Sequence, residues 1–369
     1  MSLAKVTRAF AASVISFTVL STGSAEATPF ENVFIFGDSI VDSGNRHISE
    51  GFTFAPPALG YFDGRLTGGP SLGDWFQFYA GADGGFGEAS LTGGNNYSYA
   101  GARIRDNTND LGPGTDDTPD LRAQVNSYLT SPGPAPGPND LFIINAGGND
   151  LRDLAFGVPD LPTVDAEIDP LNMFPPDLNG GLFIASAAQQ LVDVIVDLEF
   201  SGVENILLML PPDSARAPDT IAFANSPANP FTPEELLTLT RQGSEALRDT
   251  ILLRLGLRDM SFASDLRTFD YLPFTDALIS DPTLFGFADD LNVTTPCIGF
   301  MGENGAPDVD CSGFAFFDSI HPTSQVYEEI ALAALGQTFG LPTEVSEPSS
   351  LALLGLGLAG FMAYRRRAA

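Results

Sequence analysis

Apolar residues gather along the chain in short continuous runs, and each run ends in small or polar residues. The runs lie at 32–36, 141–145 and 205–210, and they are followed by Gly-Asp-Ser, Ala-Gly-Gly-Asn-Asp and Pro-Pro, respectively. Short apolar runs bounded by turn residues are typical of buried β-strands. The pattern therefore predicts three strands that are covered on both faces.

Amphipathic stretches lie between and after these runs. Residues 182–199 place Ala185, Leu191 and Leu198 on one face, which predicts a helix. A second helix is expected to begin at Pro233, because Thr232 can cap it and Glu235 completes a capping box. The segments 81–94 and 106–140 are rich in Gly and Pro and are expected to be loops. Buried strands alternating with amphipathic helices predict an α/β fold with a parallel central sheet.

The N-terminus has the layout of a secretory signal peptide. Lys5 and Arg8 flank an apolar stretch over 9–20, and small residues then lead to Ala25-Glu26-Ala27. A basic flank, an apolar run and an A-x-A site in this order predict cleavage after Ala27. We therefore expect the protein to be exported.

The C-terminus has a similar three-part order. An apolar run over 351–364 follows Ser346-Glu347-Pro348 and precedes Arg365-Arg366-Arg367. The run is shorter than the roughly 20 residues of a relaxed spanning helix, so hydrophobicity alone leaves membrane anchoring open. The order resembles the bacterial PEP-CTERM sorting tail, although Ser346 stands where the first Pro would be. The resemblance implies an exosortase-type partner and a folded domain outside the cytoplasm, secreted or at the cell surface.

These observations divide the chain into three parts: a signal peptide over 1–27, one domain over 28–343 and a sorting tail over 344–369. The net charge of −30 makes nucleic acid and anionic membrane surfaces poor partners. Acidic residues gather at Asp116-Asp117 and Asp120, but they lack the spacing of a calcium-binding loop, so no metal is predicted.

Cys297 and Cys311 are the only cysteines of the chain. They lie in a Gly-rich segment of a protein that we expect to be exported, which predicts a disulfide. The alternative is a pair of zinc ligands, and it would require further Cys or His residues nearby.

The chain has two histidines, His47 and His321. His47 lies in a polar segment with no carboxylate at a suggestive spacing. Asp318, three residues before His321, can reach the imidazole and stabilise its charged form, although a surface Asp–His pair has the same spacing. Ser39 follows the first predicted strand, and a serine hydroxyl needs a neighbouring base to act as a nucleophile. The G-x-S-x-G elbow is absent, which argues against an α/β-hydrolase proper.

Four blocks of sequence resemble those of the GDSL esterases and lipases of the SGNH superfamily, in family order. They lie at 36–45, 94–102, 147–150 and 318–323. The resemblance implies a flavodoxin-like three-layer α/β/α fold with Ser39 as nucleophile, His321 as base and Asp318 as its partner. It also implies an oxyanion hole formed by the backbone N–H groups of Ser39 and Gly101 and the side-chain amide of Asn149. Ala100 replaces the first of two glycines that are usual in the second block.

The segment 279–287 and the two cysteines resemble a longer subgroup, which includes plant GDSL lipases and bacterial haemolysin-like phospholipases. In that subgroup the cysteines commonly form a bridge. We therefore expect a secreted hydrolase of carboxylic esters that needs no cofactor and acts on a lipid or an acylated carbohydrate. The alternatives are an acyltransferase, a polysaccharide O-acetyl esterase, and a surface protein without catalytic activity.

Overall fold

The computed structural model describes residues 30–82, 84–105, 118–131, 135–156, 179–258 and 264–341. The predicted signal peptide, the predicted sorting tail and Asp116-Asp117 lie outside the described residues. No helix within the described ranges combines the length and the apolar character that crossing a bilayer requires.

A parallel sheet of four strands, in the order β1-β2-β3-β4, forms the centre of the molecule. The three predicted strands are confirmed. The fourth was not predicted because Asp265 and Arg267 interrupt its apolar residues, as suits a partly exposed edge strand. The strands are β1 (Asn32–Gly37), β2 (Asp140–Asn145), β3 (Asn205–Met209) and β4 (Asp265–Phe269).

A further segment, 95–99, runs parallel to β1. The Ile35 N–H donates to the Asn95 carbonyl oxygen at 3.0 Å, and the Tyr97 N–H donates to the Ile35 carbonyl oxygen at 2.7 Å. With this segment counted as the second strand, the order becomes 2-1-3-4-5, which is the doubly wound order of flavodoxin-like folds. The predicted three-layer fold is thereby confirmed. In such sheets, ligands bind outside the carboxyl ends of the strands, at the point where the strand order reverses, which here lies beside β1.

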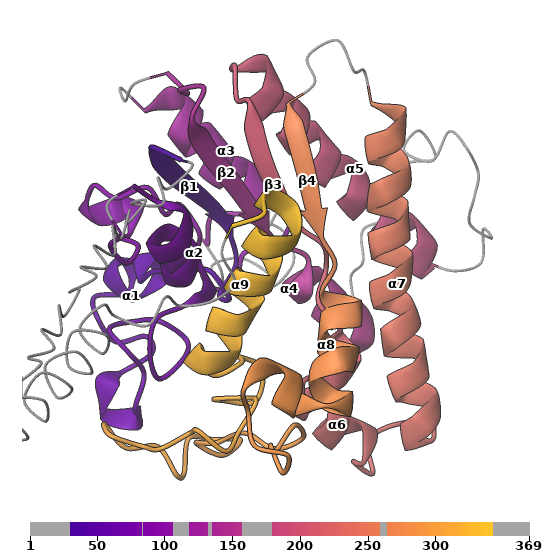
Figure 1. Ribbon diagram of the computed structural model, residues 1–369. Helices are drawn as coiled ribbons and strands as arrows, with labels where there is room; N and C mark the ends of the chain where they lie inside the picture. The colour runs from indigo at the N-terminus through magenta and orange to yellow at the C-terminus, as the bar shows by residue number, and fades with distance from the viewer. Residues whose placement is uncertain are drawn as a thin grey trace, which may run out of the picture.

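Helices cover both faces of the sheet (Figure 1). Helices α3, α5 and α7 pack on one face, and α2, α8 and α9 pack on the other. Side chains alternate between the two layers, so that Phe34 and Phe36 join the first and Val33 and Ile35 join the second. The helices are α1 (Asn45–Ser49), α2 (Leu72–Ala80), α3 (Leu121–Thr130), α4 (Gly148–Phe156), α5 (Asn179–Phe200), α6 (Pro218–Ala224), α7 (Pro233–Leu257), α8 (Tyr271–Ser280) and α9 (Ser324–Phe339).

The two predicted helices are present as α5 and α7. Helix α7 begins with the predicted capping box, in which Thr232 Oγ1 accepts from the Glu235 N–H and the Glu235 carboxylate accepts from the Thr232 N–H. The prediction of a loop over 106–140 was wrong in part, because α3 forms there. The Asp120 carboxylate caps α3 by accepting from the Ala123 N–H at 2.8 Å.

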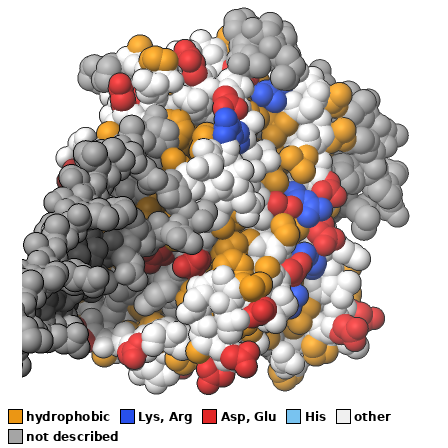
Figure 2. All heavy atoms as spheres, viewed as in Figure 1, with side chains coloured by type: hydrophobic (Ala, Val, Ile, Leu, Met, Phe, Trp, Pro, Cys, Tyr) orange, Lys and Arg blue, Asp and Glu red, His pale blue; other side chains and the backbone are white. Residues whose placement is uncertain are grey.

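Acidic side chains are spread along the edges of the face that Figure 2 shows, and arginines lie beside several of them. Some ion pairs are nearly buried, such as Arg65 with Asp74 at 3.0 Å and Arg103 with Asp153 at 2.6 Å. In these two pairs arginine neutralises a carboxylate that is removed from solvent.

Candidate active site

Ser39 lies just beyond the carboxyl end of β1, and Gly37 shapes the turn that leads to it. Gly37 has φ of +150°, and a Cβ atom there would lie 1.9 Å from the Asn145 carbonyl oxygen. The Gln124 side chain of α3 accepts from the Gly37 N–H at 2.8 Å and donates to the Gly37 carbonyl at 2.9 Å. Only glycine fits here. The Gln124 side chain bonds both backbone polar groups of Gly37 and so fixes the end of the strand that leads to Ser39.

Three predicted residues form one row of hydrogen bonds. His321 Nε2 lies 2.8 Å from Ser39 Oγ, and His321 Nδ1 lies 2.8 Å from each oxygen of the Asp318 carboxylate. Asp318 and His321 are buried in the loop before α9, whereas Ser39 is partly exposed. This is the geometry in which an imidazole can take a proton from a serine hydroxyl while a carboxylate fixes its orientation.

Additional donors hold the Asp318 carboxylate. Oδ1 accepts from the N–H groups of Ile320 and His321 at 2.9 and 2.8 Å, and Oδ2 accepts from the Tyr61 hydroxyl at 3.0 Å. Burial by itself raises the pKa of Asp318, but the charge of His321 and the hydrogen bonds from His321 and Ile320 outweigh it. The pKa of Asp318 is therefore lowered, and the carboxylate is ionised at neutral pH. Sequence reasoning missed Tyr61, which no local spacing connects to Asp318.

The predicted oxyanion residues lie in segments that are tied to each other. Asn149, at the start of α4, donates from its side-chain amide to the Ala102 carbonyl at 2.8 Å, next to Gly101. Gly101 has φ of +90°. The Ala100 N–H donates to the Asp42 carboxylate at 2.9 Å, so the second sequence block is anchored to the first. Ala100 does not have a positive φ, so this position does not require glycine, and its side chain is buried.

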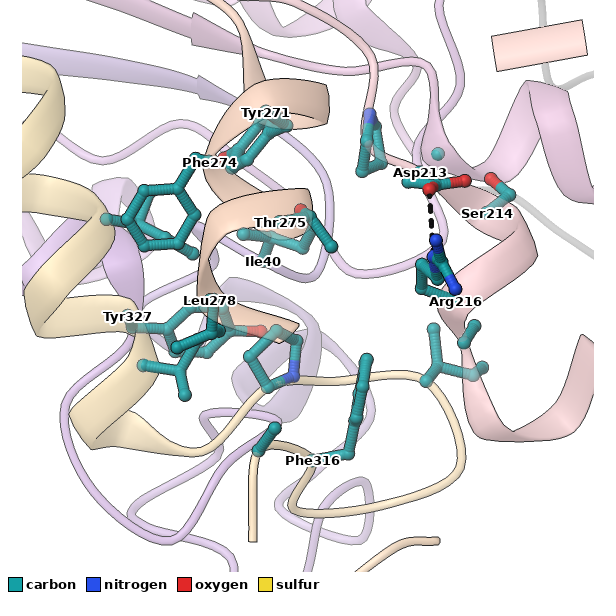
Figure 3. Close-up of a pocket in the computed structure, with 18 of the residues that line it drawn as sticks. Ile40, Asp213, Ser214, Arg216, Tyr271, Phe274, Thr275, Leu278, Phe316 and Tyr327 are labelled. Carbon is teal, nitrogen blue, oxygen red and sulfur yellow. Dashed lines mark ion pairs between the residues drawn. The ribbon is translucent and has the colours of Figure 1, made fainter. Parts of the chain in front are cut away.

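A cavity of about 110 Å³ adjoins Ser39 and Asn149, both of which line it. Most of its wall is apolar and comes from α8, α9 and the loop before α9. Figure 3 shows Leu278 from α8 and Tyr327 from α9 on one side of this space and Phe316 on the other. An apolar cavity beside a serine hydroxyl is suited to a hydrocarbon group that is attached to the reacting carbon.

The family follows from comparison with known proteins. The family model described as GDSL-like Lipase/Acylhydrolase matches residues 33–334. The chain belongs to this family. The match extends from β1 to α9 and includes Ser39, Asp318 and His321. Membership supports an esterase-type hydrolase for this GDSL protein.

Three other comparisons add less to the assignment of this GDSL hydrolase. A PEP-CTERM protein-sorting motif matches residues 344–367. No curated protein matches the chain. One solved crystal structure is similar over 84% of this chain and 98% of its own, with 14% identity and a TM-score of 0.38.

The second histidine of the GDSL hydrolase has a different environment. His47 is buried in α1, where Nδ1 contacts the Phe54 carbonyl oxygen and the ring packs edge-on against Phe52. A Cβ atom at Gly64 would lie 2.4 Å from the Cβ of His47, so the backbone also packs closely against this side chain. It is His321, and not His47, whose ring contacts the Ser39 hydroxyl.

The predicted disulfide is confirmed, since Cys297 and Cys311 are bonded with an S–S distance of 2.01 Å. The alternative of a zinc pair is therefore wrong. Within the described ranges, no group of three or more His, Cys, Asp or Glu residues is arranged to hold a metal ion. The N–H groups of Cys297 and Ile298 donate to the carbonyls of Phe316 and Phe317, each at 3.0 Å. The bridged loop thus supports the residues directly before Asp318.

Proposed function

We propose that this GDSL hydrolase is an exported serine esterase that acts through an acyl-enzyme. The observation that carries the proposal is the 2.8 Å contact between Ser39 Oγ and His321 Nε2, backed by the buried Asp318 carboxylate. Ser39 Oγ attacks the ester carbonyl carbon while His321 takes its proton. Asp318 stabilises the imidazolium that results.

The reaction is completed in two further steps. His321 donates its proton to the departing alcohol oxygen, and the acyl group remains on Ser39. Water then gives a proton to His321 and attacks the acyl carbonyl carbon. His321 returns this proton to Ser39 Oγ as the bond between Oγ and the acyl carbon breaks, which releases the acid and restores the Ser39 hydroxyl. We assign stabilisation of the oxyanion in both steps to the N–H groups of Ser39 and Gly101 and the Asn149 amide, where the loss of one donor typically costs roughly 10²- to 10³-fold in rate.

The cavity supports a substrate with a hydrocarbon acyl group. Val326 and Ile330 of α9 line it together with Phe274 and Leu278 of α8. Such a wall contributes favourable burial for each methylene group that enters, about 0.8 kcal/mol, whereas an acetyl group would leave most of the wall uncovered. We therefore favour an ester with a longer hydrocarbon acyl chain over an acetylated sugar.

Export and sorting complete the proposal. The PEP-CTERM motif at 344–367 supports recognition of the tail by an exosortase-type enzyme in bacteria, and the predicted signal peptide over 1–27 supports secretion. We place the hydrolase domain outside the cytoplasm, where the bond between Cys297 and Cys311 is stable.

The decisive experiment measures p-nitrophenyl butyrate hydrolysis by the purified protein and three variants. We expect Ser39→Ala to fall to background and Asp318→Asn to lose roughly 10³- to 10⁴-fold in kcat, because histidine is left in the wrong tautomer. Ser280→Ala is the matched control, since its exposed hydroxyl bonds only within α8, and its activity should be unchanged. Retained activity in a folded Ser39→Ala variant, or a folded parent protein that cleaves neither short nor long esters, would refute the proposal.

A further inference from the structure

One polar group in the apolar wall of the cavity has no bonded partner. Tyr327 of α9 is 1% exposed, and its hydroxyl has no hydrogen-bond partner among the described residues. Figure 3 shows this hydroxyl directed into the cavity that Ser39 also lines. A buried hydroxyl without a partner has lost its hydrogen bonds to water, so a ligand oxygen that reaches it restores favourable energy.

Two other polar side chains of the same wall are engaged within the protein. The Tyr271 hydroxyl donates to Asn145 Oδ1 at 2.5 Å, and the Asp213 carboxylate pairs with Arg216 at 3.4 Å. These groups already have partners and gain little from a ligand. The Tyr327 hydroxyl differs from these two groups because it can still form a hydrogen bond with a group of the ligand that occupies the cavity.

We propose that the cavity selects acyl groups that carry a hydroxyl or oxo oxygen along the chain, which hydrogen-bonds with Tyr327. The inference rests on the proposed function, in which the acyl group attached to Ser39 occupies this cavity. The Tyr327 hydroxyl donates to an oxo oxygen, and it can donate to or accept from a hydroxyl. An unsubstituted chain leaves the hydroxyl unsatisfied, so it binds less favourably in both the ground state and the transition state.

The test compares kcat/KM for methyl hexanoate with that for methyl 2-hydroxyhexanoate, methyl 3-hydroxyhexanoate and methyl 5-oxohexanoate, by titration of the acid released. These esters share one chain length and differ in where the oxygen lies. We expect at least one oxygenated ester to be favoured by roughly tenfold or more, the value of one hydrogen bond in a buried site. Tyr327→Phe removes the hydroxyl and keeps the ring, and it should bring the ratio close to one.

Tyr128→Phe is the matched control. The Tyr128 hydroxyl is also buried without a partner, but it belongs to the layer of α3, α5 and α7, on the other face of the sheet. Removing it should leave the ratio of the parent protein unchanged. Thermal melting of both variants separates a loss of folding from a loss of selectivity.

The possible outcomes distinguish this inference from the proposed function. If the parent protein hydrolyses methyl hexanoate as well as every oxygenated ester, the inference is wrong while the esterase proposal stands. The same conclusion follows if the preference survives in Tyr327→Phe. If no ester is cleaved in a manner that depends on Ser39, both proposals fail. A preference that Tyr327→Phe abolishes and Tyr128→Phe retains is the expected result.

Discussion

Two buried carboxyl groups near the Ser39 hydroxyl hold their protons differently. Asp318 has a lowered pKa because the charge and hydrogen bonds of His321 outweigh burial. For Asp38, burial dominates and raises the pKa to about 7, although the Ile40 N–H and the Asn145 side chain donate to it. Near neutral pH, Asp318 is thus ionised while Asp38 retains its proton in a substantial fraction of molecules.

The raised pKa of Asp38 predicts a dependence of stability on pH. Between about pH 4 and pH 7 the folded protein holds a proton on Asp38 that the unfolded chain has lost, so Asp38 makes the free energy of unfolding decrease as pH rises. The rise in the pKa of Asp38 from 3.8 to about 7 corresponds to roughly 4 kcal/mol. Asp38→Asn removes this pH dependence, so in urea unfolding from pH 4.5 to 8 the free energy of unfolding of the variant should increase relative to that of the parent protein. Parallel curves for the two proteins would contradict the prediction.

Local patterns in the sequence indicated some residues of the site, whereas distant packing determined others. Ser39 follows a buried strand, and the Asp318–His321 pair is local in sequence, so both were found, and the structure brings all three residues into contact. Their catalytic roles stay predictions. Tyr61 and Tyr327 were not found, because their positions relative to Asp318 and to the cavity depend on how α9 and the loops pack.

At the scale of elements, predictability followed burial. The fully covered strands β1 and β2 have continuous apolar sequences, whereas β4 carries Asp265 and Arg267 at the sheet edge and escaped detection. Helix α3 was hidden in a segment rich in Gly and Pro, and it is marked mainly by its Asp120 cap. Tertiary packing on the sheet stabilises such an element more than its own sequence does.

The loop closed by the disulfide supplies an element-scale prediction. Replacing Cys297 and Cys311 by serine should lower the free energy of unfolding by up to about 3 kcal/mol, the entropic value of a loop of this length. Because Cys297 and Ile298 bond the residues before Asp318, kcat/KM should fall as well. Melting curves and ester hydrolysis check both effects. Dithiothreitol should affect the parent protein and spare the double variant; a double variant that matches the parent protein in both measurements would refute the prediction.

At the scale of the whole molecule, repulsion among carboxylates competes with local ion pairs. The net charge of −30 belongs to the full chain, and acidic groups are visible along the edges in Figure 2. The ion pairs join atoms a few ångströms apart, as in Arg248 with Asp270 at 3.3 Å, and salt weakens a partly buried pair such as this one little. Repulsion between distant carboxylates is screened far more strongly.

Salt is therefore expected to stabilise this protein. Raising NaCl from 10 mM to 300 mM shortens the screening length from about 30 Å to less than 10 Å, which removes repulsion across the molecule while contacts within ion pairs survive. The melting temperature should rise by at least about 2 °C, the shift that corresponds to roughly 1 kcal/mol in a domain of this size. KCl should act as NaCl does, and uncharged glucose at equal osmolality should give a smaller rise, because it does not screen charge. A melting temperature that falls with salt would contradict the prediction. It would mean that the surface ion pairs stabilise the protein by more than repulsion among the carboxylates destabilises it.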